Sequence, residues 1–218
     1  MRTLLSLLLL SSLAMLSATS LPARAADDVQ PAKLRALIVD GQNNHAWQTT
    51  TPILKAALES SGLFTVDVAT SPPHGQSLAG FKPDFQKYDV VISNYNGDEW
   101  PAATKKAFED YVRNGGGFVS VHAADNAFPG WKEYNRMIGV GGWGGRNDSF
   151  GPMLRWRNGH VVEDHHGGGG THGKYFSFVV TTRNHTHPIT RGLPDRWLHA
   201  PDELYSTQGQ LQLRCCTG

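Results

Sequence analysis

Residues 34–69 read LRALIVDGQNNHAWQTTTPILKAALESSGLFTVDVA, and this stretch holds two apolar runs with a helical pattern between them. The run 34–39 is short, apolar and β-branched at its end, which is typical of a buried strand, and residues 64–69 alternate as a second strand. Residues 51–60 predict a helix whose first turn holds Pro52. Four apolar residues fall on one face of that helix: Ile53, Leu54, Ala57 and Leu58.

The same order of elements recurs further along the chain. Residues 88–93 and 117–121 are apolar runs that predict strands, and residues 101–112 between them predict a helix. Later segments predict a short helix over 131–138 and strands over 176–182 and 197–199. Runs that are hydrophobic on both faces indicate parallel strands with helices on both sides. The sequence therefore predicts an α/β protein with an open, doubly wound parallel sheet.

Three polar loops leave these predicted strands, at residues 40–47, 94–100 and 122–128. Each contains Asn and Asp together with His or Trp. In an open parallel sheet, ligands bind in the crevice outside the carboxyl ends of the strands. We therefore expect the three loops to converge there and to form the functional site.

His122 and Asp125 lie where the strand 117–121 runs directly into its loop. A sharp turn after a buried strand presents its first side chain into the crevice, in the manner of a nucleophile elbow. An imidazole at this point predicts a general base or acid, with Asp125 as its partner. The turn carries no Ser or Cys, so the pattern disfavours acyl-enzyme chemistry. The alternative is that His122 only hydrogen-bonds neighbouring backbone.

The other two loops supply side chains for substrate binding. We expect Asn44, His45 and Asp98 to bind hydroxyl groups, and Trp47 and Asn94 to add further substrate contacts. A pyranose packs its apolar face on an aromatic ring, so tryptophans beside polar loops are typical of sugar sites. Three more tryptophans fall in or beside predicted loops: Trp100, Trp131 and Trp143. For any single tryptophan, the commoner role is to cover a junction between a loop and the core.

Six histidines gather in one later segment: His160, His165, His166, His172, His185 and His187. Their spacing matches no standard zinc motif, and the glycine run 167–170 fixes no ligand geometry. We therefore predict no cofactor and a polar lid over the strand ends, in which His172 and His187 contact substrate. A structural or catalytic metal held by this segment is the alternative.

Asp202 and Glu203 form a candidate carboxylate pair near the end of the chain. Adjacent side chains point apart in a strand or helix, so at most one of them serves the site. We assign Asp202 to substrate binding and the other carboxylate to the solvated surface.

The first 25 residues predict a secretory signal peptide. A short positive start precedes the apolar run 4–16, and Ala23-Arg24-Ala25 gives the small-x-small pattern of a cleavage site. The run is short for a membrane span, and a retained anchor is the alternative. We expect a mature chain from Ala26, with a linker over 26–33, in the periplasm or secreted, and free of the membrane after cleavage.

Charge and cysteine content narrow the function classes further. The formal net charge is +1, and no basic stripe is visible, so no nucleic-acid partner is predicted. The two cysteines, Cys215 and Cys216, are adjacent and cannot form a disulfide framework. No oligomeric state is predicted.

Three separated blocks resemble the trehalose-utilisation (ThuA-like) family over residues 34–205. They are GGGFVSVHAA at 115–124, NHTHPITRGLP at 184–194 and DELY at 202–205. The resemblance implies a flavodoxin-like fold of the class I glutamine amidotransferase type. Amidotransferases carry a catalytic Cys at the elbow where this chain has His122, so glutaminase activity is not expected.

The resemblance also implies a small-molecule carbohydrate as partner. The first function expected is acid–base chemistry at His122 on a carbohydrate or glycoside, including 3-keto sugars, as a hydrolase or lyase. The alternatives are a non-catalytic carbohydrate-binding module of the same fold and a metal-dependent hydrolase using the histidines at 160–187.

The chain departs from the family pattern after Tyr205. Residues 206–218 read STQGQLQLRCCTG where further strands are expected. We therefore expect an aberrant tail, a C-terminally truncated sheet and exposed apolar surface.

Overall fold

The computed structural model describes residues 32–139, 141, 147–148, 151–166, 171–207 and 210–211. The expected signal peptide, most of the linker and Trp143 lie outside these residues. The elements run in chain order: β1 Leu34–Asp40, α1 Trp47–Ser60, β2 Phe64–Thr70, β3 Val90–Ser93, α2 Ala102–Arg113, β4 Gly117–Ser120, α3 Lys132–Ile138, β5 Met153–Arg157, β6 His160–Asp164, β7 Thr171–His172, β8 Phe176–Thr181, β9 Arg196–Asp202, β10 Tyr205–Thr207 and β11 Gln210–Leu211. Short 3-10 helices cover Phe85–Lys87 and His122–Asn126.

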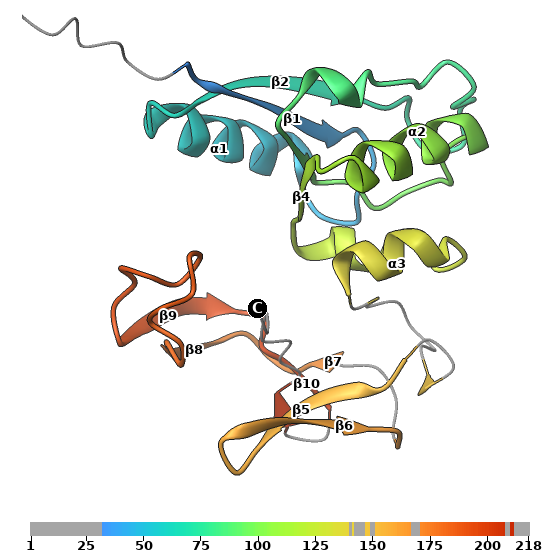
Figure 1. Cartoon of the computed structure of the whole chain (residues 1–218). Helices are drawn as coiled ribbons and strands as arrows, with labels where there is room; N and C mark the ends of the chain where they lie inside the picture. The colour runs from blue at the N-terminus through green and yellow to red at the C-terminus, as the bar shows by residue number, and fades with distance from the viewer. Residues whose placement is uncertain are drawn as a thin grey trace, which may run out of the picture. The chain divides into compact units, whose positions relative to one another are not determined.

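The first four strands form a parallel sheet in the order β2-β1-β3-β4, of which Figure 1 labels β2, β1 and β4. β1 pairs with β2 on one side and with β3 on the other, and β4 extends the sheet beyond β3. The strand order therefore reverses at β1, which makes the junction of β1 and β3 the switch point where α/β sheets bind ligands. The predicted parallel sheet is confirmed.

Helices cover both faces of this sheet, as expected for a flavodoxin-like α/β fold (Figure 1). Alternate residues of β1 face opposite sides: Ala36 and Ile38 join one buried cluster, and Leu37 and Val39 join the other. Leu54 of α1 packs on the first cluster, whereas residues of α2 and α3 belong to the second. Every strand residue from Ala36 to Val39 is at most 2% exposed, so β1 is the centre of the core.

The start of α1 differs from the sequence prediction. The helix begins at Trp47 rather than at residue 51, so Pro52 lies inside it. Pro52 has no N–H to donate to the carbonyl of Gln48, and that carbonyl lies in the first, exposed turn where water can solvate it. Ile53, expected on the buried face, is 62% exposed.

An aromatic core lies on the α2 and α3 side of the sheet. Trp100 and Trp131 are 3% and 6% exposed, and their ring centroids are 6.0 Å apart. Trp100 also meets Phe108 edge to face at 5.9 Å and Phe128 at 5.2 Å. A buried side chain of this size contributes roughly 1.5–3 kcal/mol by removal from water. Trp100 and Trp131 therefore serve packing and not a sugar site, as the loop–core alternative predicted.

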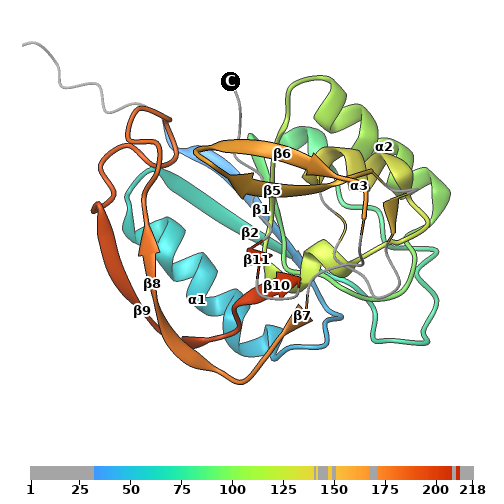
Figure 2. The same cartoon turned by 90° about the horizontal axis from the view of Figure 1, so that it is seen from below.

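The rest of the described chain forms short antiparallel pairs. β5 pairs with β6, β8 with β9, and β10 with both β7 and β11 (Figure 2). The segment after His160 is thus a strand, where the sequence suggested only a polar lid. Several apolar side chains of the β8–β9 region are exposed, among them Val179 at 51% and Leu198 at 70%. In the described part of the chain, no helix has the length and hydropathy required to cross a bilayer.

Candidate functional site

The end of β4 places His122 in a strained turn. His122 has φ +46°, a left-handed backbone conformation that is uncommon outside glycine. It begins the 3-10 helix His122–Asn126 one residue after β4 ends at Ser120. Its side chain is 46% exposed, so the ring can reach a ligand. Strain of this kind persists where the surroundings impose it, and it is often found at functional sites.

The His122 ring meets residues from two distant parts of the chain. Its Nε2 lies 3.1 Å from Nε2 of His45, which comes from the loop after β1. The same atom lies 3.4 Å from Oε2 of Glu203, which follows β9. We call these three residues the His–Glu cluster. Each ligand atom of the cluster lies within 4.8 Å of the other two, which makes it a possible metal site.

Glu203 has a side chain that is only 8% exposed. Besides the His122 ring, three other side chains contact its carboxylate. Its Oε1 accepts the Tyr175 hydroxyl at 3.2 Å and lies 3.4 Å from Nε2 of His172. Its Oε2 accepts the Tyr205 hydroxyl at 2.8 Å. Desolvation alone would raise the pKa of Glu203, but the hydroxyl of Tyr205, the charge of His172 and the remaining partners outweigh it and lower that pKa. Glu203 is therefore an ionised carboxylate at neutral pH.

The two tyrosines respond to the same carboxylate. Desolvation and the adjacent Glu203 raise the pKa of Tyr205 to about 12. The hydrogen bond to Glu203 is the largest cause that raises the pKa of Tyr175. Both hydroxyls therefore stay protonated and keep donating to Glu203.

Asp125, expected as the partner of His122, makes a different contact. Its Oδ1 accepts the Ser120 hydroxyl at 2.9 Å. Desolvation is the main cause that raises the pKa of Asp125, although the residue as a whole is exposed; the Ser120 hydrogen bond and the His122 charge act in the opposite direction. The carboxylate within contact distance of the His122 ring is thus Glu203, and Asp125 acts on that ring through charge alone.

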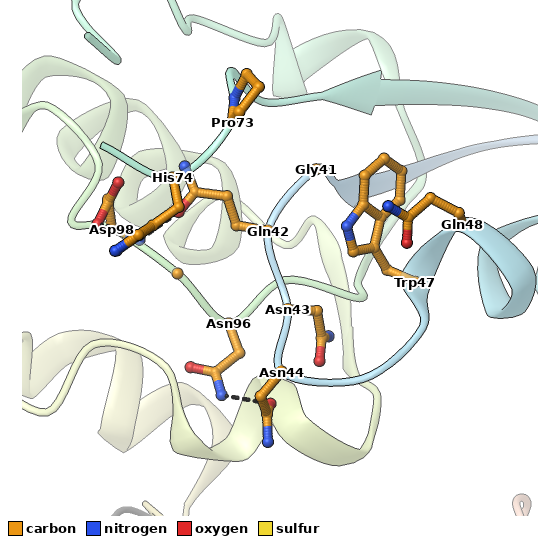
Figure 3. Close-up of a pocket in the computed structure, with 11 residues that line it drawn as sticks. Gly41, Gln42, Asn43, Asn44, Trp47, Gln48, Pro73, His74, Asn96 and Asp98 are labelled. Atoms are coloured by element: carbon orange, nitrogen blue, oxygen red, sulfur yellow. Dashed lines mark hydrogen bonds and ion pairs between the residues drawn. The ribbon is translucent and has the colours of Figure 1, made fainter. Parts of the chain in front are cut away.

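A cavity of about 600 Å³ lies at the switch point (Figure 3). It is formed by the loop after β1 and the loop after β3, with Pro73 and His74 from a third segment. Five of its eleven lining residues carry a side-chain amide, and Trp47 supplies one aromatic ring. The lining residues are Gly41, Gln42, Asn43, Asn44, Trp47, Gln48, Pro73, His74, Asn96, Gly97 and Asp98.

Gln42 fixes the shape of this cavity. Its Oε1 accepts the backbone N–H of Asp98 at 2.7 Å, and its Nε2 donates to the carbonyl of Pro72 at 2.8 Å. A Cβ at Gly97 would lie 2.2 Å from Oε1 of Gln42, so this close approach requires glycine. The Asn96 amide donates to Oδ1 of Asn44 at 3.0 Å, and the dashed line in Figure 3 marks this bond between the same two loops. The two loops are therefore tied together by hydrogen bonds of side chains and backbone.

Three expected binding residues line the cavity: Asn44, Trp47 and Asp98. Asp98 is engaged by Nδ1 of His74 at 2.8 Å and by the backbone N–H of Gly75 at 2.8 Å. Two more expected residues, His45 and His172, lie at the cluster, where His45 contacts His122 and His172 contacts Glu203.

The remaining expected residues lie elsewhere. Asn94 is 4% exposed, and its amide donates to the hydroxyls of Thr50 and Thr51, so it ties β3 to α1. His187 accepts the backbone N–H of Ile189 within its own turn. Asp202 is exposed, and its Oδ1 accepts the backbone N–H of Glu203.

Sequence reasoning missed Glu203 and its two tyrosines. The only signal was the pair Asp202-Glu203, and the rule that adjacent side chains point apart says that one is turned inward without saying which.

Of the histidines at 160–187, only His172 contacts the cluster among the described residues. His165 binds Asp148 and His185 lies near Asp195, while His166 is 96% exposed.

Comparison with known proteins gives one family. The family model described as ThuA, trehalose utilisation, matches residues 35–213. A crystal structure of a putative ThuA-like protein from Parabacteroides merdae ATCC 43184 is 47% identical, with a TM-score of 0.77, over 80% of this chain. The match covers 63% of that protein, so the present chain spans less than two thirds of its length.

A second solved structure shares the fold alone. A putative ThuA-like protein from Bacteroides uniformis ATCC 8492 is 22% identical, with a TM-score of 0.51, over 88% of this chain and 66% of that chain. No curated protein matches the sequence.

Proposed function

The chain belongs to the ThuA (trehalose utilisation) family, and from that premise we propose that it acts on a carbohydrate or glycoside by proton-transfer chemistry centred on His122. The observation that carries the proposal is the His–Glu cluster, in which His122 lies 3.1 Å from His45 and 3.4 Å from Glu203. An ionised, nearly buried carboxylate beside an imidazole stabilises the positive charge that the imidazole gains when it takes a proton.

The cavity beside the cluster supports a sugar as substrate. Asn44 lines the cavity, and the next residue, His45, belongs to the cluster. Amide groups both donate and accept hydrogen bonds, as hydroxyl groups do, and they can therefore pair with several hydroxyls of one sugar. Trp47 adds an aromatic surface for the apolar face of the ring. A volume of about 600 Å³ lies within the range of small-molecule sites.

A 3-keto sugar is the substrate form that best suits a proton-transfer site. The keto group at C3 makes the hydrogen on C2 acidic, so a base can remove it. The electron pair left on C2 forms a C1–C2 double bond, the C1–O bond breaks, and the departing oxygen takes a proton from a second group. The products are an unsaturated keto sugar and a free alcohol, and no oxidant or nucleophile is required.

The test is a screen of the purified chain against glucosides, disaccharides and their 3-keto forms, read by mass spectrometry. We expect consumption of at least one compound and a loss of turnover of about 10²–10⁴-fold in His122→Ala. The matched control is His166→Ala, since His166 is 96% exposed and outside the cluster. Failure to consume any compound, or equal turnover in His122→Ala, would contradict the proposal.

A carbohydrate-binding module is the second candidate function. The amide-rich wall of the cavity favours it because that wall can bind hydroxyls without any proton transfer. Calorimetric titration separates the two: a module binds sugar equally well with and without His122 and yields no product.

We also propose that the chain is exported, with residues 1–25 as the signal peptide.

A further inference from the structure

We propose that His45, His122 and Glu203 together bind one divalent transition-metal ion of the zinc type. This ion site differs from the histidine segment that the sequence suggested, since none of the three residues lies between 160 and 187. The inference deepens the proposed function, on which it rests for its role, but ion binding can be measured without any substrate.

The distances within the cluster suit ligands of one ion. Zinc binds imidazole nitrogen and carboxylate oxygen at about 2.0–2.2 Å, so two ligands at a tetrahedral angle lie about 3.3 Å apart. The two Nε2 atoms of His45 and His122 are 3.1 Å apart, and Nε2 of His122 is 3.4 Å from Glu203. The third pair, His45 and Glu203, lies within 4.8 Å, and the exposed ring of His45 has room to rotate towards a shared ion.

The distance between His122 and Glu203 is long for a hydrogen bond alone. A charge-assisted bond between imidazolium and carboxylate is about 2.7–2.9 Å long, but the one between His122 and Glu203 would be 3.4 Å. One proton on Nε2 of His122 cannot point at both His45 and Glu203. A cation between the three atoms satisfies all of their lone pairs at once, because each ligand then directs its own pair at the ion.

Hydrogen bonds from neighbouring side chains orient the Glu203 carboxylate, as they do for the carboxylate ligands of metal sites. The hydroxyls of Tyr175 and Tyr205 hold its two oxygens, and His172 lies 3.4 Å from Oε1. Hydrogen-bonded partners behind a ligand fix its direction and maintain its charge, and their loss commonly weakens metal binding by about 10–100-fold. Three separate chain segments deliver the ligands, so the site requires the whole fold.

The donor set selects the class of ion. Two imidazoles and one carboxylate suit zinc and its neighbours in the first transition series, whereas magnesium and calcium prefer oxygen ligands throughout. The His122 side chain is 46% exposed, so the ion would keep open positions for water or a substrate oxygen. Three protein ligands with an open position are the arrangement of catalytic zinc.

A bound ion would change how His122 contributes to the proposed chemistry. His122 would then hold the ion through its Nε2, and the ion would supply a bound water for proton transfer, whose pKa zinc lowers to about 7. A keto oxygen on the ion would also be polarised, which makes the neighbouring C–H more acidic.

The experiment uses the purified chain after removal of metal with a chelator. Zinc, manganese or magnesium chloride is titrated in by calorimetry, and the metal retained after gel filtration is measured by elemental analysis. We expect one zinc per chain, weaker binding of manganese and none of magnesium. His45→Ala and Glu203→Gln should each weaken zinc binding by at least about 10-fold, while the control His166→Ala keeps it. Circular dichroism checks that each variant is folded, and His45 lies on an exposed loop where substitution leaves the core intact.

Zinc that stays at one per chain in the folded His45→Ala variant would overturn the site, as would wild-type protein that retains no zinc. Turnover that survives chelation unchanged would overturn the role of the ion and leave proton transfer by His122 itself. Zinc binding without consumption of any sugar would contradict the proposed function and leave the site standing.

Discussion

At the residue scale, His122 combines an unfavourable backbone with a central position in the site. Its φ of +46° brings Cβ close to the following carbonyl, which costs an ordinary residue about 1–2 kcal/mol. Glycine avoids that cost, so a histidine here is explained by what its ring contacts and not by the turn itself.

We therefore expect His122→Gly to have a higher free energy of unfolding than His122→Ala, by about 1 kcal/mol. Urea denaturation of both variants measures the difference. The same pair of substitutions at Val121, whose φ is −109°, should give the opposite order, because glycine there only adds flexibility to the unfolded chain. Equal stabilities at residue 122 would argue against backbone strain in the turn.

Glu203 and Asp202 are chemically alike and adjacent, but only Glu203 is nearly buried and bound by donors. Its pKa is lower in the folded chain than the ordinary value of 4.5. The folded state thus binds this proton less readily than the unfolded state, and ionised Glu203 stabilises the fold above the ordinary pKa. That stabilisation is lost as pH falls through the lowered pKa.

Thermal unfolding against pH should show this difference after divalent ions are removed. We expect wild type to exceed Glu203→Gln most at neutral pH, with the gap closing as the pH falls below about 4.5. Asp202→Asn is the matched control, and its gap to wild type should stay small throughout because the side chain is exposed. A gap for Glu203→Gln that is independent of pH would mean that its charge does not stabilise the fold.

At the scale of elements, the tryptophans near the strand ends have two different roles, one in the core and one in the cavity wall. Trp100 follows β3 and is 3% exposed in the aromatic core, whereas Trp47 opens α1 and lines the cavity. Trp100→Ala should lower the free energy of unfolding by about 3–5 kcal/mol. Trp47→Ala should change stability little and weaken sugar binding, as calorimetry can measure. The reverse pattern would contradict the assignment of the two rings.

The parallel sheet and the β8–β9 pair also differ in how much surface they bury. Ile38 in β1 is 0% exposed, and Leu198 in β9 is 70% exposed. Ile38→Ala should cost about 2–5 kcal/mol because it leaves a cavity between the sheet and α1. Leu198→Ala should cost less than about 0.5 kcal/mol. Chemical denaturation of the two variants tests this, and similar losses would mean that β9 is packed more tightly than its exposure indicates.

At the scale of the whole molecule, the proposed export makes a prediction about the mature chain. Produced in a bacterium with its leader, the protein recovered outside the cytoplasm should begin at Ala26, because small residues at 23 and 25 form the cleavage pattern. Mass spectrometry of the intact protein reads the start directly. Bulky substitutions at Ala23 and Ala25 should block processing, and a recovered chain that retains Met1 would contradict the prediction.

Much of the fold follows from local patterns. The strands β1 to β4 and the helices between them appear as apolar runs and amphipathic stretches, because a buried strand or helix face must be apolar wherever it occurs. The sequence pattern was least reliable for the ends of helices and strands. The helix α1 begins at Trp47 and not at residue 51, because Pro52 is tolerated inside a helix where the lost hydrogen bond faces water. The β5–β6 pair was missed because its strands are half polar and show no continuous apolar run.

The sequence by itself determined the α/β class, the family and the strand end at His122, since each is recognised from short local stretches and their order along the chain. Only the tertiary structure decided which side chains meet that histidine. His45 lies 77 positions away from His122, and Glu203 reaches it from the end of β9. Such contacts depend on how separate elements pack against one another, and nothing in the local pattern distinguishes the inward carboxylate of Glu203 from the exposed one of Asp202.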